Sequence, residues 1–231
     1  MIPIRDTERR TAKPLVVILL ILANAVVFLY ELSLGNRLEG FVFNWGLVPD
    51  KYFQLAGMGP STYMDRFLPI YTSMFMHGGV LHIAFNMVFL YIFGDNVEDH
   101  MGKLRFLLFY LLCGTAAAYL QLYASPASQL PMVGASGAIA GVLGGYLVLF
   151  PRARVLALVP IFLFFQIVEL PAYLFIGFWF VLQFLVGTAS LMDKARDSGG
   201  TAYFAHVGGF VAGLILVKLF ARHVTAANGN T

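Results

Sequence analysis

The stretch MVGASGAIAGVLGGYLVLF, from Met132 to Phe150, carries no charged residue and repeats glycine at positions 137, 141 and 145. About 20 apolar residues are enough for an α-helix to cross a bilayer. Small residues four positions apart form a smooth ridge that lets a second helix approach closely. The stretch therefore predicts a membrane helix packed tightly on a neighbour, with Ser136 near its start.

The composition of the whole chain agrees with this interpretation. Of 231 residues, 59% are hydrophobic and 12% are charged, whereas soluble domains carry about 25% charged residues. The net charge of +3 comes from basic residues spread between apolar blocks, which indicates membrane orientation rather than binding to nucleic acid. The single cysteine, Cys113, excludes an intrachain disulfide and is expected to pack in the core.

Six apolar segments are long enough to span a membrane, which predicts an all-α, polytopic helical bundle forming a single domain over residues 1–231. We read the first segment as a retained helix rather than a signal peptide, because no convincing cleavage site follows it. Residues 1–13 are then a cytoplasmic lead-in, residues 33–76 a long aromatic outer loop at the interface, and residues 221–231 a polar tail. The expected spans are Pro14–Leu32, Gly79–Val97, Leu104–Tyr123, Met132–Phe150, Pro171–Ser190 and Thr201–Phe220.

The apolar run that begins at Val155 leaves two alternatives open. Residues 155–168 are long enough for a marginal seventh span, which would place His206 on the opposite side of the membrane from Ser136. Pro160 and the nearby Glu169-Leu170-Pro171 favour an interfacial, partly extended segment instead. We expect the extended form, and we assign no role to Glu169.

Basic residues give the orientation. With the amino terminus inside, the inner segments hold ten Lys and Arg residues and the outer segments hold five, so the positive-inside rule predicts a cytoplasmic amino terminus. The inner ten are Arg5, Arg9, Arg10, Lys13, Lys103, Arg105, Arg152, Arg154, Lys218 and Arg222. Asp95, Glu98 and Asp99 close the second span on this inner side, where we expect them to be solvated.

Three polar residues share one predicted depth. His82, Ser136 and His206 each lie a few residues into a span that runs from outside to inside. At 1.5 Å per residue, all three fall just below the outer surface. Gly209 and Gly213 continue the small-residue pattern in the last span, so close contact between the fourth and sixth spans would bring His206 to Ser136.

The residue types at this depth suggest a reaction. A serine, a distant histidine and the pair His82 and Asn86, four apart on one helical face, are the parts of a nucleophile, a base and an oxyanion hole. Each alone fits a plain structural role, because buried polar side chains often only bond to their own or a neighbouring helix. We expect that role for Gln183. The motif His-Glu-x-x-His is absent and the confident spans carry no pair of acids, so we expect neither a metal nor a cofactor.

These motifs resemble the rhomboid family of intramembrane serine proteases. The matching pieces are HGGVLHIAFN (77–86), GASG (134–137), FGDNVE (93–98), PRAR (151–154) and AHVGGFVAG (205–213). The resemblance implies Ser136 as nucleophile, His206 as general base, and an oxyanion hole of His82, Asn86 and the Ser136 backbone N–H. The glycines implied to support helix packing are Gly134, Gly137, Gly141, Gly209 and Gly213.

Two positions depart from the family pattern. Leu68-Pro69 stands where the family commonly has Trp-Arg, and Ala140 stands where some members place an aromatic residue that packs on the base. Both departures concern the support of the site rather than its reacting groups.

The resemblance implies an intramembrane endopeptidase that cleaves transmembrane protein segments near the outer face by a Ser–His dyad. Its partners would be transmembrane substrates and membrane lipids, and the short loops fit a bacterial inner membrane. By position and resemblance, residues 193–200 would form a mobile cap and the fifth span a lateral gate. The alternative is a catalytically silent rhomboid-like protein that binds or chaperones membrane helices. The sequence indicates neither the natural substrate nor the oligomeric state.

Overall fold

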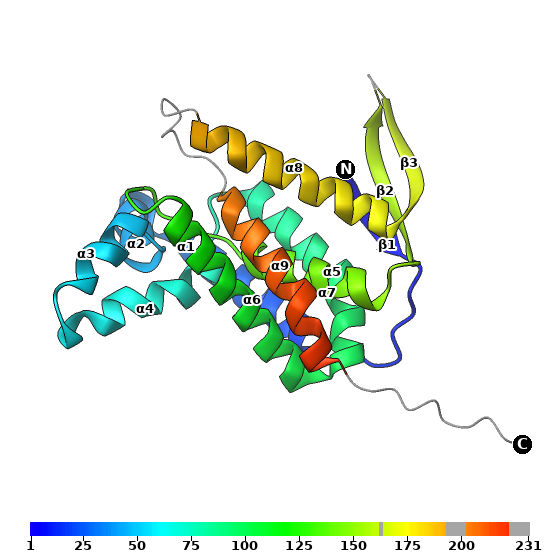
Figure 1. Cartoon of the computed structure of the whole chain (residues 1–231), viewed down its shortest axis with the longest axis horizontal. Helices are drawn as coiled ribbons and strands as arrows, with labels where there is room; N and C mark the ends of the chain where they lie inside the picture. Colours follow the sequence, from blue (N-terminus) through cyan, green and yellow to red (C-terminus); the bar gives the residue numbers. More distant parts are fainter. Residues whose placement is uncertain (162–163, 193–201, 222–231) are drawn as a thin grey trace, which may run out of the picture.

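A computed structural model describes residues 1–161, 164–192 and 202–221, and these form a helical membrane bundle (Figure 1). Four helices are long and apolar enough to span a membrane, and two shorter apolar helices lie at Ser136–Leu149 and Ala172–Val186. Each coincides with one of the six predicted spans. The six helices are α1 (Leu15–Ser33), α5 (Val80–Met101), α6 (Lys103–Ala124), α7 (Ser136–Leu149), α8 (Ala172–Met192) and α9 (Tyr203–Phe220).

Helix α7 is short and lies at the centre of the bundle. Its 14 residues span only about 21 Å at 1.5 Å per residue, less than the roughly 30 Å hydrocarbon core. Every residue from Gly137 to Tyr146 is buried. Irregular backbone at membrane depth is tolerated where protein covers it or where it lines a wet cavity. The segment Leu130–Gly134 before Ser136 lines a cavity and is such a case.

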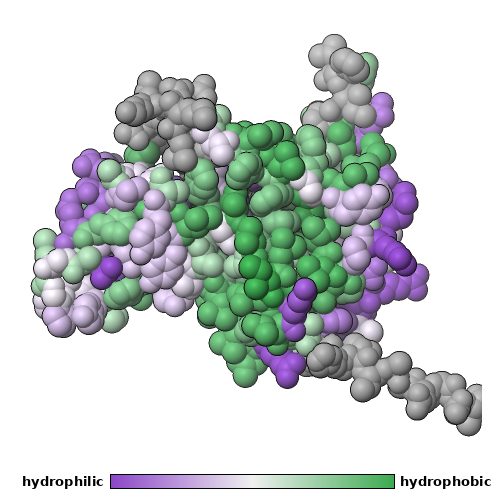
Figure 2. Space-filling model, in the orientation of Figure 1, coloured by the Kyte–Doolittle hydropathy of each residue, from purple (hydrophilic) through white to green (hydrophobic). Residues whose placement is uncertain are grey.

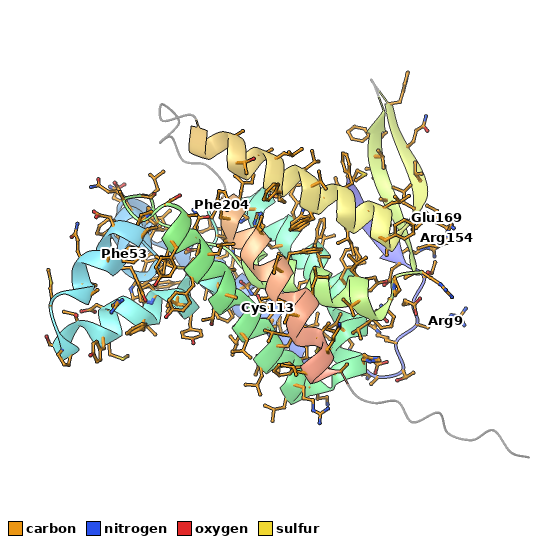
Figure 3. The ribbon with its side chains drawn as sticks, viewed as in Figure 1. Arg9, Phe53, Cys113, Arg154, Glu169 and Phe204 are labelled. Atoms are coloured by element: carbon orange, nitrogen blue, oxygen red, sulfur yellow. The ribbon has the colours of Figure 1, made fainter. Side chains whose placement is uncertain are left out.

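Glycines allow α7 and α9 to touch backbone to backbone. A Cβ atom on Gly209 would lie 1.9 Å from the carbonyl oxygen of Gly137, and one on Gly213 would lie 2.0 Å from that of Gly141. Residues with side chains could not occupy either position at this separation. The predicted contact between the fourth and sixth spans is therefore present. Gly141 also packs on Cys113, which is buried in the bundle as expected (Figure 3).

The long outer loop folds into short helices beside the bundle, at the left of Figure 1. Rings of the loop pack edge to face on one another and on α6, with Tyr52 against Phe67 and Tyr119 and Phe53 against Tyr123. The Arg66 guanidinium lies 4.4 Å from the Tyr52 ring centroid. These contacts hold the loop to α6. Its elements are η1 (Gly35–Arg37), α2 (Leu38–Trp45), α3 (Pro49–Ala56), η2 (Pro60–Thr62), α4 (Tyr63–Thr72) and η3 (Ser73–Phe75).

The segment after α7 is a β-hairpin rather than a seventh helix over the described residues 155–161 and 164–168. Strands β2 (Arg154–Ile161) and β3 (Phe164–Pro171) pair antiparallel, which confirms the extended interpretation. Strand β1 (Ile2–Asp6) adds antiparallel to the other edge of β2, a contact that the sequence did not predict. Glu169 forms an ion pair with Arg154 across the hairpin, near its base (Figure 3).

The acids at the inner end of α5 were expected to be solvated, and this prediction is wrong. They bind the amino-terminal segment instead. The Glu98 carboxylate is buried and accepts hydrogen bonds from the backbone N–H groups of Val16 (3.0 Å) and Val17 (2.8 Å). Asp99 accepts from the backbone of Thr11 (2.6 Å), and Asp95 pairs with Arg10. The first N–H groups of a helix lack partners within the helix and favour negative charge, so Glu98 caps α1.

The lead-in is tied to the bundle by a second polar contact. Asp6 accepts hydrogen bonds from the Tyr146 hydroxyl and the Asn96 amide. Burial raises the pKa of Asp6, an effect that these two hydrogen bonds oppose. This end of the bundle therefore carries the amino-terminal segment, the sheet and most of the basic residues.

The surface has an apolar centre with hydrophilic residues on either side. Figure 2 shows apolar residues over α8 and α9, with polar residues over the outer loop at one side and around the amino-terminal segment and β2 at the other. Large apolar side chains point outward on several helices, among them Val26 (66% exposed) and Ile215 (62%). An exposed apolar surface of this kind marks contact with a membrane or a partner, and with the four helices that are long and apolar enough to span a bilayer it indicates an integral membrane protein.

We expect Gly209→Ala to destabilise the bundle by about 3 kcal/mol, because the new methyl group must push α9 away from a backbone carbonyl rather than from a flexible side chain. The free energy of unfolding in detergent measures this. Gly177→Ala on α8 is the matched control, since no atom lies within 4 Å of the added methyl group. Equal stabilities of the two variants would contradict the close contact.

Replacing Glu98 by Ala should cost about 2 kcal/mol of stability, because it leaves two backbone N–H groups at the start of α1 without their charged acceptor. Glu169→Ala is the control, since its ion pair with Arg154 is half exposed and such pairs are worth about 1 kcal/mol or less. The same unfolding measurement compares them. A loss for Glu169→Ala as large as that for Glu98→Ala would refute the cap.

Candidate active site

Ser136 and His206 meet at one end of the bundle. The Ser136 hydroxyl oxygen lies 2.7 Å from Nε2 of the His206 ring. Ser136 is the first residue of α7 and His206 the fourth of α9, so both lie at helix amino termini. The contact follows from the glycine interface, because Gly137 and Gly209 hold the two helices together beside it. The two residues are therefore placed for proton transfer.

The surroundings of Ser136 favour negative charge. As the first residue of α7, it leaves its own backbone N–H and the next ones without partners inside the helix, and no side chain caps this helix end. The amino terminus of a helix also carries a partial positive charge. An anion forming on or beside the Ser136 oxygen would be stabilised there.

His82 and Asn86 line the same cavity as Ser136. His82 Nδ1 accepts a hydrogen bond from the Gly78 backbone N–H (3.4 Å), so the proton of the neutral ring is on Nε2. A Cβ atom on Gly134 would lie 2.8 Å from that Nε2. The Asn86 side chain is buried and its amide nitrogen has no acceptor within the described part of the chain. Both side chains thus have an N–H free to donate into the cavity.

Gly134 differs from the other predicted packing glycines. It lies before α7 rather than in it, with φ at +130°, a conformation that residues with a side chain rarely adopt. Its backbone N–H donates to the Ser73 carbonyl (2.8 Å). The close approach to His82 and this backbone turn both require glycine, so Gly134 shapes the cavity wall instead of a helix contact.

The cavity has a volume of about 670 Å³ and is bounded by α5, α6, α7, α8 and α9. Its wall includes the segment Leu130–Gly134 and the residues Met74, Phe85 and Ala117. It is mainly apolar, with polar groups concentrated around Ser136.

His77 stands behind His82. The two rings lie 5.1 Å apart, edge to face, and the His77 backbone N–H donates to the buried Glu31 carboxylate (3.1 Å). Burial and, to a lesser degree, the charge of His82 lower the pKa of His77 to about 4. His77 is therefore neutral at neutral pH and supports the turn that leads into α5.

Two residues of α8 contact the His206 ring and were not singled out as site residues from the sequence. Gln183 Oε1 lies 2.8 Å from His206 Nδ1, and the Trp179 ring centroid lies 5.7 Å from that of His206. Trp179 is thus an aromatic neighbour of the His206 ring, while position 140 carries a buried alanine. Their spacing of four places both on one face of the fifth span, which is the signal that could have revealed them.

Other predicted features lie away from the site or outside the described residues. The expected cap, residues 193–200, and the tail from residue 222 belong to the parts that the structure does not describe. Pro69 is buried within α4. Among residues 1–161, 164–192 and 202–221, no three His, Cys, Asp or Glu side chains come together as a metal-binding group.

The chain is also similar in sequence to known proteins. A family model described as the rhomboid domain matches residues 65–223. The chain is 30% identical over 158 residues to Rhomboid protein 1, mitochondrial, of Saccharomyces cerevisiae, covering 66% of this chain and 42% of that protein. It is 32% identical over 136 residues to Rhomboid protease AarA of Providencia stuartii, covering 53% and 46% of the two chains.

A shorter match is closer in sequence. Rhomboid protease GluP of Bacillus subtilis is 42% identical over 76 residues, which cover 33% of this chain and 14% of that protein. Each of these matches spans less than half of the relative's own length. The family model, by its residue range, includes both Ser136 and His206.

Proposed function

The chain belongs to the rhomboid family, and on that premise we propose that it is an intramembrane serine endopeptidase working through a Ser136–His206 dyad. The observation that carries the proposal is the 2.7 Å contact between the Ser136 hydroxyl and His206 Nε2. A serine is a weak nucleophile unless an adjacent base accepts its proton. Relatives whose names call them rhomboid proteases add support.

The reaction uses groups that line one cavity. His206 Nε2 accepts the hydroxyl proton while the Ser136 oxygen attacks a peptide carbonyl. The carbonyl oxygen becomes an oxyanion, to which the His82 Nε2–H, the Asn86 amide and the Ser136 backbone N–H donate. His206 then gives the proton to the leaving amine as the C–N bond breaks. Water, activated by the same base, hydrolyses the acyl-enzyme ester and restores Ser136.

The proposed substrates are transmembrane segments of other proteins. Helices that diffuse in the bilayer can reach a site among helices, but their peptide bonds are held in i→i−4 hydrogen bonds. A substrate must therefore unwind locally, and small or helix-breaking residues near the outer face would ease this. Ser136 lines the cavity, and a shallow site that opens outward would receive the water that hydrolysis needs without that water crossing the whole bilayer.

We place the chain, as a single membrane domain, in a bacterial inner membrane with the sheet end facing the cytoplasm. The concentration of basic residues at the sheet end supports this orientation. The short connections support the bacterial assignment: α5 ends at Met101 and α6 begins at Lys103. The competing function is a catalytically silent protein that binds membrane helices. The presence of both Ser136 and His206 in contact favours the enzyme.

Ser136→Ala should abolish cleavage of a generic transmembrane substrate in detergent, a fall of at least about 10⁴-fold, because the attacking oxygen is removed. Gel-resolved cleavage by the purified full chain measures it. Ser61→Ala, at an exposed serine in the outer loop, is the matched control and should cleave at the normal rate.

Covalent labelling separates the enzyme from the silent alternative. A serine-directed fluorophosphonate should label the native chain and should label neither Ser136→Ala nor His206→Ala. The free energy of unfolding in detergent, measured for each variant, checks that both remain folded. Full-rate cleavage by Ser136→Ala would eliminate the proposed nucleophile. A native chain that neither cleaves nor labels would favour the silent binding protein.

Asn86→Ala should lower kcat by about 10²- to 10³-fold with little change in KM, since its amide is proposed to bind the oxyanion more strongly than the ground-state carbonyl. Initial-rate kinetics on the same substrate measure both constants. Asn36→Ala, in the exposed outer loop, provides the comparison. A rise in KM with unchanged kcat would assign Asn86 to substrate binding instead.

A further inference from the structure

Gln183 gives the His206 ring a second partner, opposite Ser136. Its Oε1 lies 2.8 Å from Nδ1, while the Ser136 oxygen lies 2.7 Å from Nε2. We propose that Gln183 is a positioning residue that accepts the Nδ1 proton and so holds His206 in the tautomer able to act as base. The inference rests on the proposed function and adds to it the group that orients the base.

The tautomer determines whether His206 can accept a proton. A neutral imidazole has one ring nitrogen that donates and one that accepts. For Nε2 to accept from the Ser136 hydroxyl, the ring proton must be on Nδ1, where only an acceptor can pair with it. Gln183 Oε1 is at hydrogen-bond distance there. With the proton on Nε2, the ring would donate to Ser136 and could not activate it.

An amide here takes the position that a carboxylate has in a Ser–His–Asp triad. In such triads the acid holds the imidazole in the correct tautomer, and losing that hold costs about 10⁴-fold in kcat. The hydrogen bonds that His206 makes within the described part of the chain go to Ser136 and Gln183. The other groups around the ring are His82 across the cavity and the rings of Trp179 and Tyr203.

Gln183 belongs to a helix that is held mainly at its inner end. Near the start of α8, Phe175 and Ile176 are at most 1% exposed. Farther along, the side chains that face the bundle, Trp179, Phe180 and Gln183, are only half-buried. Gln183 contacts His206 from this half of the helix. The orientation of the base therefore depends on how the outer half of α8 sits against α9.

A purely structural role for this hydrogen bond makes a different prediction. A glutamine in an apolar helix needs a partner, and His206 provides one. If that were its whole purpose, an apolar replacement would leave catalysis unchanged, since it removes the polar group that needed a partner. If Gln183 orients the base, the same replacement lowers kcat.

Gln183→Met tests this in the full chain in detergent, because methionine keeps the length of the side chain and lacks a strong acceptor. We expect kcat to fall about 10²-fold with KM nearly unchanged. Gln183→Glu, which keeps an acceptor oxygen, should restore activity to within about 10-fold of the native rate. Leu185→Ala, on the exposed face of α8, controls for loosening of the helix and should leave kcat unchanged.

The ¹⁵N chemical shifts of the His206 ring test the same inference without proteolysis. In the native chain Nδ1 should carry the proton and Nε2 should not, and Gln183→Met should shift the population toward the other tautomer. If no Ser136-dependent cleavage is found, the proposed function fails. The ¹⁵N shifts then still test whether Gln183 sets the tautomer of His206.

Three results would overturn the inference. The first is native kcat in Gln183→Met. The second is an equal loss of kcat in Leu185→Ala, which would indicate a general effect of loosening α8. The third is a His206 tautomer that does not change when Gln183 is replaced.

Discussion

The contact between α7 and α9, backbone against backbone, is the constraint on which the site depends. Gly137 faces Gly209 and Gly141 faces Gly213 at separations that leave no room for a Cβ atom. In a bilayer, lipid tails are as apolar as leucine, so close packing rather than hydrophobic burial drives helices together. The same contact that stabilises the bundle also sets the distance between Ser136 and His206.

Much of this architecture could be predicted from the sequence because it follows from local patterns. Apolar length located the six helices, and Pro160 with the charged flanks predicted the extended segment after α7. The equal depth of Ser136 and His206 followed from counting spans, and the glycine spacing predicted which spans touch. The chemical roles of these residues remain predictions, although the structure places the side chains together.

The features that the sequence did not reveal are contacts between distant polar residues. Glu98 caps a helix that begins more than 80 positions earlier, and Asp99 binds Thr11; an acid near a span end looks solvated until its partner is known. Strand β1 pairs with β2 although its sequence carries little strand signal of its own. Gln183 bonds to a neighbouring helix as expected, but the sequence did not indicate which atom is its partner, Nδ1 of His206.

The difference in burial between the inner and outer halves of α8 has a consequence for the timing of the proposed reaction. Phe175 and Ile176 at its inner end are buried, with Phe175 stacked on Phe89 and Phe93 of α5, while its outer half bears the Gln183 amide, which contacts the His206 imidazole. A polypeptide that enters by displacing the outer half would separate that amide from the ring. Cleavage would then have to wait until α8 returned. Displacement of the outer half of α8 and orientation of the His206 ring by Gln183 would therefore exclude each other. As a result, membrane proteins that enter the site and dissociate before α8 returns would not be cleaved.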